Sequence, residues 1–124
     1  MNATFEALGG LTVIRPEGPH LDAGRVREFR KDVVERLAPG MRVLLDLAAL
    51  QFIDSAGCGA ILACSRRVHP DESSPGGLKI CGVSRPVRSI FQMIRLHKVI
   101  DIHNTRDEAL RAFEAERESA SMLG

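Results

Sequence analysis

The residues with the clearest chemical potential lie near the middle of the chain, in the segment FIDSAGCG over residues 52–59. Ser55 carries the hydroxyl of this segment, Asp54 precedes it, and Gly57 and Gly59 follow closely. If a helix begins here, its unpaired backbone N–H groups and partial positive charge stabilise a phosphate on the serine. The glycines remove side chains beside Ser55, so another backbone can approach closely. The segment therefore predicts a phosphate acceptor at the start of a helix.

Two other interpretations of Ser55 compete with phosphorylation. Serine is common at helix N-caps, so local physics alone favours Ser55 as a simple cap, with glycines that only ease packing. A serine hydrolase needs a glycine two residues before the nucleophile, and this chain has Ile53 there. It also needs a histidine base, and the four histidines are scattered along the chain: His20, His69, His97 and His103. We therefore expect no catalytic residue and no enzyme.

The cysteines and histidines form no recognisable metal or disulfide pattern. The chain has three cysteines, an odd number without a CxxC pair: Cys58, Cys64 and Cys81. This usage is typical of reduced, buried thiols rather than of a disulfide framework or a zinc site. No two histidines have the i, i+4 spacing of a shared helical face. We therefore predict no metal site and no cofactor.

Composition and charge argue against several classes of function. The chain has 124 residues, which suits one domain that buries its core without disulfides. Lys plus Arg number 17 against 16 for Asp plus Glu, whereas a nucleic-acid binder needs a clustered basic surface. No apolar run approaches the length of a membrane span, and residues 1–10 lack the blocks of a signal peptide. We expect a cytoplasmic protein with no nucleic-acid partner and no membrane insertion.

The first part of the chain predicts a hairpin, a helix and a buried strand. Thr4–Leu8 and Leu11–Arg15 are β-prone runs, and the Gly-Gly pair between them suits the positive φ angles of a tight turn. Asp22 is placed to cap a helix. The apolar residues of that helix recur at helical spacing: Val26, Phe29, Val33 and Leu37. The run at 43–47 is apolar on both faces, as in a central strand covered by helices.

After this strand the chain predicts a helix, a loop and a further strand. The helix begins at Ser55 and runs to about Val68. The composition of His69–Gly77 is that of a loop, and Leu78–Cys81 follows as a strand. The alternation of strands and helices indicates a single α/β sheet with helices packed against it.

The last part of the chain predicts two helices with a strand between them. Ser84 is placed to cap the first of these helices. Its apolar residues recur at helical spacing: Val87, Ile90, Phe91 and Ile94. A strand at Val99–Ile102 then leads to the final helix, which begins with a capping box formed by Thr105 and Glu108.

With these elements in order, the chain resembles a STAS domain, in particular the bacterial anti-sigma factor antagonists. The resemblance covers about residues 4–113 and is strongest in VLLDL followed by FIDSAGCGAIL. EGPHLDAGRV, GGLKICGVSRPVRSIFQMIRLHKVIDIH and TRDEALRAF resemble the other parts of the family pattern. The resemblance implies a STAS domain over residues 1–118 and a frayed tail over 119–124. Its fold would be a mixed sheet of about five strands with about four helices packed mainly on one face.

The resemblance also implies a partner-switching cycle. In the family, the unmodified antagonist binds an anti-sigma factor that is also a serine kinase, and this releases a sigma factor. The kinase phosphorylates the serine that corresponds to Ser55, which prevents binding, and a serine phosphatase reverses the modification. The implied partner-binding residues are Asp22, Asp54, Ser55, Ala56, Gly57 and Gly59. The alternative is a scaffold that does not cycle, such as the small partner of a lipid-transport ATPase or a member of a stress-sensing assembly.

Overall fold

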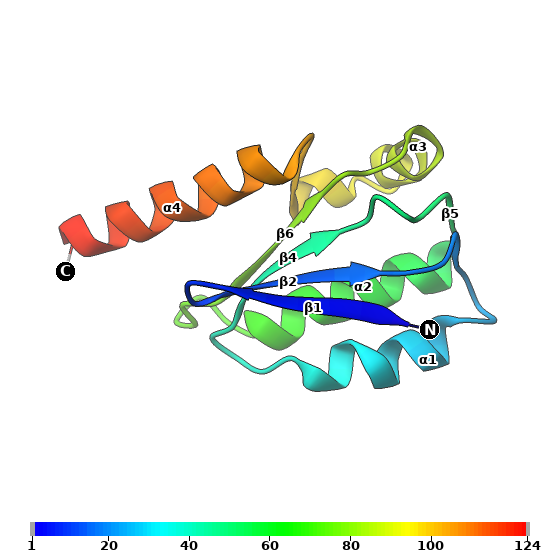
Figure 1. Ribbon diagram of the computed structural model, residues 1–124, viewed down its shortest axis with the longest axis horizontal. Helices are drawn as coiled ribbons and strands as arrows, with labels where there is room; N and C mark the ends of the chain where they lie inside the picture. The colour runs from blue at the N-terminus through cyan, green and yellow to red at the C-terminus, as the bar shows by residue number, and fades with distance from the viewer. Residues whose placement is uncertain (1, 124) are drawn as a thin grey trace.

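The computed structural model describes residues 2–123, and the side chains of residues 2–119 (Figure 1). Its centre is a five-stranded sheet in the order β1-β2-β4-β6-β7. β1 is antiparallel to β2, and the other neighbouring strands are parallel. The bounds of these strands are Ala3–Leu8 (β1), Leu11–Pro16 (β2), Arg42–Asp46 (β4), Gly77–Cys81 (β6) and Asp101–His103 (β7). The mixed α/β sheet predicted from the sequence is confirmed.

The hairpin of β1 and β2 turns on two glycines, as predicted. Gly9 and Gly10 have φ angles of +53° and +86°, which L side chains rarely adopt. Leu8 pairs with Leu11 across the turn, and the register continues without a skipped residue. A two-residue turn with positive φ at both positions matches the twist of the flanking strands. The turn therefore sets the register in which β2 presents its side chains to the core.

Four helices join and cover the strands. Their bounds are Val26–Asp32 (α1), Ser55–Val68 (α2), Arg85–Met93 (α3) and Arg106–Leu123 (α4). The predicted helix through Leu37 is interrupted, because α1 ends at Asp32 and a short 3-10 turn, η1 (Val34–Arg36), follows. Val33 and Val34 are both buried, although neighbours in an α-helix point about 100° apart. Val33, with φ −119°, departs from regular α-helical geometry at the junction of the two elements, and this break in the helix accompanies the burial of both side chains.

Side chains of the sheet alternate between two apolar clusters, so both faces of the sheet are covered. Val43 and Leu45 belong to the larger cluster, which includes buried residues of α1, α2 and α3. Leu44 and Cys81 belong to the smaller one, where Phe113 of α4 covers them. Three helices thus contribute to one cluster and α4 to the other, with α1 and α2 below the sheet and α4 above it (Figure 1). The predicted one-sided distribution is confirmed, with α4 as the exception.

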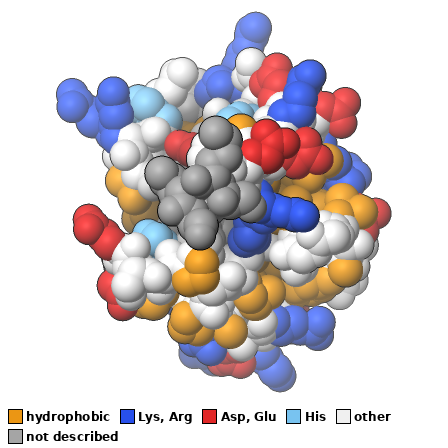
Figure 2. Space-filling model, turned by 90° about the vertical axis from the view of Figure 1, so that its left-hand side faces the viewer, with side chains coloured by type: hydrophobic (Ala, Val, Ile, Leu, Met, Phe, Trp, Pro, Cys, Tyr) orange, Lys and Arg blue, Asp and Glu red, His pale blue; other side chains and the backbone are white. Residues whose placement is uncertain are grey.

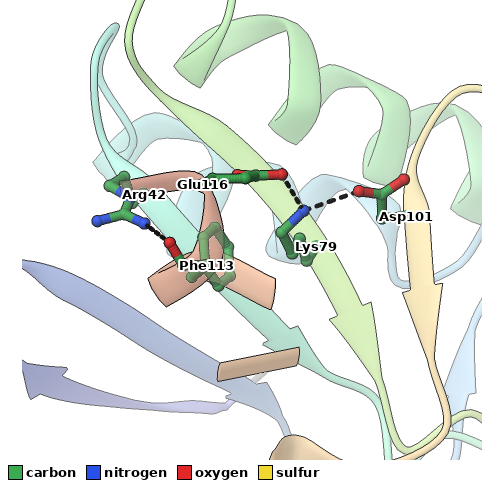
Figure 3. Close-up of polar contacts among 5 residues, drawn as sticks. All are labelled: Arg42, Lys79, Asp101, Phe113 and Glu116. Atoms are coloured by element: carbon green, nitrogen blue, oxygen red, sulfur yellow. Dashed lines mark hydrogen bonds and ion pairs between the residues drawn. The ribbon is translucent and has the colours of Figure 1, made fainter. Parts of the chain in front are cut away.

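A buried lysine fastens α4 to the sheet (Figure 3). The side chain of Lys79 on β6 is 5% exposed, and its Nζ lies 2.7 Å from carboxylate oxygens of both Asp101 and Glu116. Burial opposes the charged ammonium, but the hydrogen bonds and charges of the two carboxylates outweigh it and raise the pKa of Lys79. Arg42 donates a hydrogen bond of 2.6 Å to the carbonyl of Phe113. These contacts hold the apolar side of α4 against the sheet.

The two ends of α3 differ from the sequence prediction. Ser84 occupies the N-cap position, but its hydroxyl makes no capping bond and is buried without a hydrogen-bond partner in the described structure. Val87 and Phe91 are buried as expected, whereas Ile94 lies beyond the helix and is 48% exposed. Arg95 adopts a left-handed conformation with φ 59°, which turns the chain out of the helical path. The apolar periodicity therefore overestimated this helix by one residue.

The capping box predicted at the start of α4 forms in a shifted version. Glu108 donates its backbone N–H to Thr105 Oγ1 at 3.1 Å, as expected. Its carboxylate accepts the N–H of Asn104 at 3.2 Å rather than that of Thr105. α4 continues to Leu123. The domain bounds at 1–118 and the frayed tail at 119–124 stay predictions, and Gly124 lies outside the described residues.

The two ends of the sheet have different surroundings. Beyond the carboxyl ends of β2 and β4, the short strands β3 (His20–Leu21) and β5 (Phe52–Ile53) form a second, parallel pair that leads into α2. The other end, with the β1–β2 turn, faces the viewer in Figure 2, where acidic and basic side chains alternate with apolar ones. A mixed surface of this kind lacks the single-sign field that attracts a polyanion.

Candidate functional site

Ser55 is the first residue of α2, and it is exposed. It follows directly on β5 and Asp54, and the pairing of β5 with β3 brings the segment after Leu21 beside it. Among residues 2–119, no side-chain hydrogen bond engages the Ser55 hydroxyl. The predicted position at the start of a helix is confirmed. The hydroxyl is accessible to a phosphorylating enzyme and to a binding partner.

Asp54, not Ser55, caps α2. Its Oδ1 accepts the N–H of Gly57 at 2.9 Å, and its Oδ2 accepts the N–H of Ala23 at 2.9 Å. The hydrogen bond from Gly57, with that from Ala23, lowers the pKa of the Asp54 carboxyl. The interpretation of Ser55 as the N-cap is therefore wrong. The Asp54 carboxylate therefore caps the N-terminus of α2 and also links α2 to the segment that follows β3.

Asp22 was predicted to cap α1, and this prediction is wrong. The N-cap position of α1 belongs to Arg25, which makes no side-chain capping bond. Asp22 instead stabilises the turn ahead of the helix, because its Oδ1 accepts the N–H of Gly24 at 3.1 Å. Its carbonyl accepts the N–H groups of Arg25 and Val26, both at 2.9 Å. This turn, which precedes α1, brings the backbone of residues 22–24 beside Asp54, where the N–H of Ala23 donates to the carboxylate.

The two glycines of the motif have different roles. A Cβ at Gly57 would lie 2.2 Å from the carbonyl oxygen of Leu21 and 2.7 Å from a side-chain carbon of Ile53. The close backbone approach predicted at this position is confirmed, and the approaching backbone is the protein's own. Gly59 has open space where its Cβ would be, so no backbone of the described residues approaches it, and for this glycine the close approach stays a prediction. Gly57 is therefore required for β3 to pack against α2.

The site does not have the arrangement of a hydrolase. Ile53 is buried at the position where a nucleophile elbow requires glycine. No histidine hydrogen-bonds to Ser55 in the part of the chain that the structure describes. The geometry instead offers an exposed hydroxyl at a helix N-terminus, directly after Asp54, whose carboxylate is bonded to the segment that contains Asp22. Such a site suits transfer of a phosphoryl group to the hydroxyl by another protein.

An aromatic pair beside the serine was missed by the sequence predictions. The rings of His20 and Phe52 lie 5.9 Å apart in an edge-to-face arrangement at an interplanar angle of 86°. Phe52 is 49% exposed, a large fraction for a phenylalanine side chain. The available signal was the alternation in β5, which points Phe52 away from the core if Ile53 points inward. The pair adds an apolar border to the polar surface around Ser55.

The class of protein follows from the fold and the site together: a small mixed α/β domain with an exposed serine at the start of its second helix. This chain belongs to the STAS domain family, whose model matches residues 2–109. Within the described residues, no helix has the length and apolar character needed to cross a bilayer.

Several similar proteins are named as anti-sigma factor antagonists. An anti-sigma F factor antagonist from Paenibacillus polymyxa is 28% identical over 107 residues, which cover 85% of this chain and 88% of that protein. An anti-sigma factor antagonist from Mycobacterium paratuberculosis has the same fold, with a TM-score of 0.76 at 20% identity, covering 90% of this chain and 92% of that one. The antagonist SpoIIAA in its unphosphorylated form gives a TM-score of 0.67 at 24% identity, covering 92% and 97%. The phosphorylated form of SpoIIAA from Bacillus gives a TM-score of 0.59 at 22% sequence identity, and the match covers 90% of this chain and 99% of that one.

Proposed function

We propose that this protein is an anti-sigma factor antagonist whose binding is controlled by phosphorylation of Ser55. The unphosphorylated form binds an anti-sigma factor that is also a serine kinase, and this binding releases a sigma factor. A serine phosphatase removes the phosphate and restores binding. The observation that carries the proposal is the exposed Ser55 hydroxyl at the first position of α2, with no internal hydrogen bond among the described residues. Similarity to proteins named as anti-sigma factor antagonists supports the choice of partner.

The location of Asp54 strengthens the electrostatic effect of a phosphate. A phosphate adds about −1.5 to −2 charges and three acceptor oxygens. At an uncapped helix N-terminus these oxygens would be neutralised by backbone N–H groups, but the N–H of Gly57 is already bonded to Asp54. The phosphate would also follow directly on Asp54, whose carboxylate is bonded to the segment that carries Asp22. The added charge is therefore directed toward the partner, and an acidic group opposite would cost the complex several kcal/mol.

The proposed partner surface divides into contacting and supporting residues. Ser55 is exposed, and Asp22 and Ala56 are half-buried, and we propose that these three touch a partner. Gly57 is buried beneath them and acts by allowing the close approach of β3. Asp54 acts by bridging α2 and the 22–24 segment. Gly59 is half-buried in the second turn of α2 and extends the same surface.

The protein acts in this proposal by binding in the cytoplasm, not by catalysis. A scaffold subunit that does not cycle would use the same face for constitutive docking. The two possibilities differ in one respect, because only the switch requires binding to respond to charge at Ser55.

The test uses Ser55→Ala, Ser55→Asp and Ser73→Ala as baits for capture from the native cytoplasm, beside the unaltered protein. The unaltered protein, Ser55→Ala and Ser73→Ala should each retain a serine kinase, whereas Ser55→Asp should retain much less. With ATP, the captured kinase should add one phosphate to the unaltered protein and to Ser73→Ala, and none to Ser55→Ala. Mass spectrometry of peptides identifies the modified residue.

The fold must stay intact for this comparison to be informative. Ser55 does not cap α2, so Ser55→Ala should change the free energy of unfolding by less than about 0.5 kcal/mol, as expected of surface substitutions. Ser55→Asp places a carboxylate at a helix N-terminus, which is favourable for stability. Equal capture by Ser55→Asp and the unaltered protein would favour the scaffold, and a phosphate on Ser73 or Ser74 would refute the site.

A further inference from the structure

One edge of the sheet is open along a whole strand. β1 is outermost in the strand order and pairs on one side only, with β2 (Figure 1). Five of its six residues, from Thr4 to Leu8, are exposed. The opposite edge strand, β7, has three residues. β1 is thus the longer of the two edges at which backbone groups can meet another strand.

The register of the hairpin determines which groups of β1 point outward. Leu8 and Leu11 flank a two-residue turn, and such flanking residues exchange both backbone hydrogen bonds. In an antiparallel pair this bonding alternates, so Thr4 and Glu6 also direct their N–H and C=O groups toward β2. The groups of Ala3, Phe5 and Ala7 therefore point away from the sheet. No strand in the described structure pairs with them.

β1 carries few of the devices that protect an edge strand from pairing. It contains neither proline nor lysine, and its register with β2 has no bulge. Its one charged side chain, Glu6, is bound to Arg106 of α4 at 3.1 Å. On the other face, Phe5 remains 37% exposed, with the guanidinium of Arg36 4.8 Å from its ring centroid. The strand thus offers free backbone groups and an incompletely covered aromatic ring.

We propose that β1 pairs antiparallel with β1 of a second copy of this chain, with Phe5 of one copy opposite Phe5 of the other. This register satisfies the outward groups of Ala3, Phe5 and Ala7 on both copies, because each Ala3 then lies opposite an Ala7. It brings the two Phe5 rings together across a two-fold axis, where each retains its Arg36. The interface is self-complementary, as a two-fold dimer requires.

The charge of Glu6 and the number of paired backbone groups favour this register over registers shifted along the strand. With Phe5 at the centre, Glu6 of each copy lies opposite Thr4 of the other, where a hydroxyl can donate to the carboxylate. A register centred on Glu6 would set two carboxylates against each other, and it would place Ala3 opposite Gly9, inside the turn. A register centred on Ala7 would place Phe5 opposite Gly9, inside the turn, and leave Ala3 unpaired. The Phe5-centred register therefore satisfies the most groups.

The contact involves one strand of each copy, so the dimer is weak and the fraction of dimer depends on the protein concentration. Interfaces that bury less than about 1,200 Å² in total are typical of transient complexes. The proposal does not depend on the phosphorylation of Ser55, because its groups all lie on β1.

Two measurements on the unaltered protein test the pairing. Sedimentation equilibrium over a rising concentration series should show the average mass increasing from monomer toward dimer. Amide exchange followed by NMR should show that the N–H groups of Phe5 and Ala7 gain protection as concentration rises. Those of Thr4 and Glu6 should be protected at every concentration, because β2 already binds them.

Three variants test the register. Ala7→Pro removes an outward N–H without removing a hydrogen bond of the hairpin, and it should abolish the dimer. Thr4→Lys places an ammonium opposite Glu6 twice in the dimer and should tighten it about two- to thirtyfold. Asn2→Lys adds the same charge outside that pair, at an exposed residue opposite Leu8, and serves as the matched control.

The outcomes that overturn the proposal are distinct. A protein that stays monomeric at the highest concentration refutes the pairing, as does capture of β1 by a strand of another protein in place of a second copy. A dimer with no change in exchange at Phe5 and Ala7 places the interface elsewhere. Equal effects of Thr4→Lys and Asn2→Lys refute the register, and this comparison remains valid if Ala7→Pro fails to fold.

Discussion

Replacing Gly57 with alanine tests the close approach that shapes the candidate site. The added Cβ would lie 2.2 Å from the carbonyl oxygen of Leu21, and an ordinary contact begins at 3.4 Å. The carbonyl must therefore move by about 1.2 Å, although Leu21 is buried and its strand, β3, is paired with β5. Ile53, at 2.7 Å, blocks a sideways movement of the new methyl group.

Overpacking of this kind costs about 1–3 kcal/mol, and it opposes the gain in helix propensity of up to about 1 kcal/mol that alanine has over glycine. Gly57→Ala should therefore lower the free energy of unfolding by about 1–2 kcal/mol. Gly59→Ala is the matched control in the same helix, because its Cβ meets nothing within 4 Å. This control should raise the free energy of unfolding by about 0.5–1 kcal/mol.

Urea denaturation followed by circular dichroism measures both variants against the unaltered protein. With a slope of about 1–3 kcal/mol per molar urea, the two midpoints should move in opposite directions by amounts that are readily resolved. Gly57→Ala should also weaken partner binding, because movement of Leu21 displaces Asp22 and the bridge from Ala23 to Asp54. If Gly57→Ala is as stable as Gly59→Ala, the packing argument for this site is refuted.

Two further predictions concern ionisable groups. The hydrogen bonds from Gly57 and Ala23 lower the pKa of Asp54 below its ordinary 3.8, so its stabilising effect is complete above about pH 4 and is lost as pH falls through the lowered value. Thermal melts should therefore show a lower melting temperature for Asp54→Asn than for the unaltered protein at neutral pH, and this difference should become smaller in acid. A difference in melting temperature that does not change with pH would contradict the capping role. All three cysteines are buried, and burial raises the pKa of Cys64 to about 12 and that of Cys81 to about 11. Iodoacetamide labelling at neutral pH, counted by mass spectrometry, should modify none of them in the folded protein and all three in urea; rapid labelling of native Cys58 would show that the start of α2 opens.

Local sequence patterns were sufficient to predict most helices and strands, because the interactions that form these elements are between residues close in the sequence. The positive φ angles at Gly9 and Gly10 follow from the absence of a side chain, and they defined the hairpin. Apolar periodicity located α2 and most of α3, and it failed at Ile94 because the left-handed Arg95 turns the chain away. Ser55 was placed at a helix start by the motif around it, and the resemblance to the STAS family led to the proposal that it is phosphorylated.

The tertiary structure decided how the site is held together. The bond from Ala23 to Asp54 joins residues far apart in the chain, so this bridge from α2 to the 22–24 segment could not be read from neighbouring residues. In the same way, the difference between Gly57 and Gly59 arises only because Leu21 packs against one of them. The sequence by itself determined which residues are chemically capable at this site. Only the folded chain determined which are exposed and which support them, since that depends on contacts between β3 and α2 that no local pattern encodes.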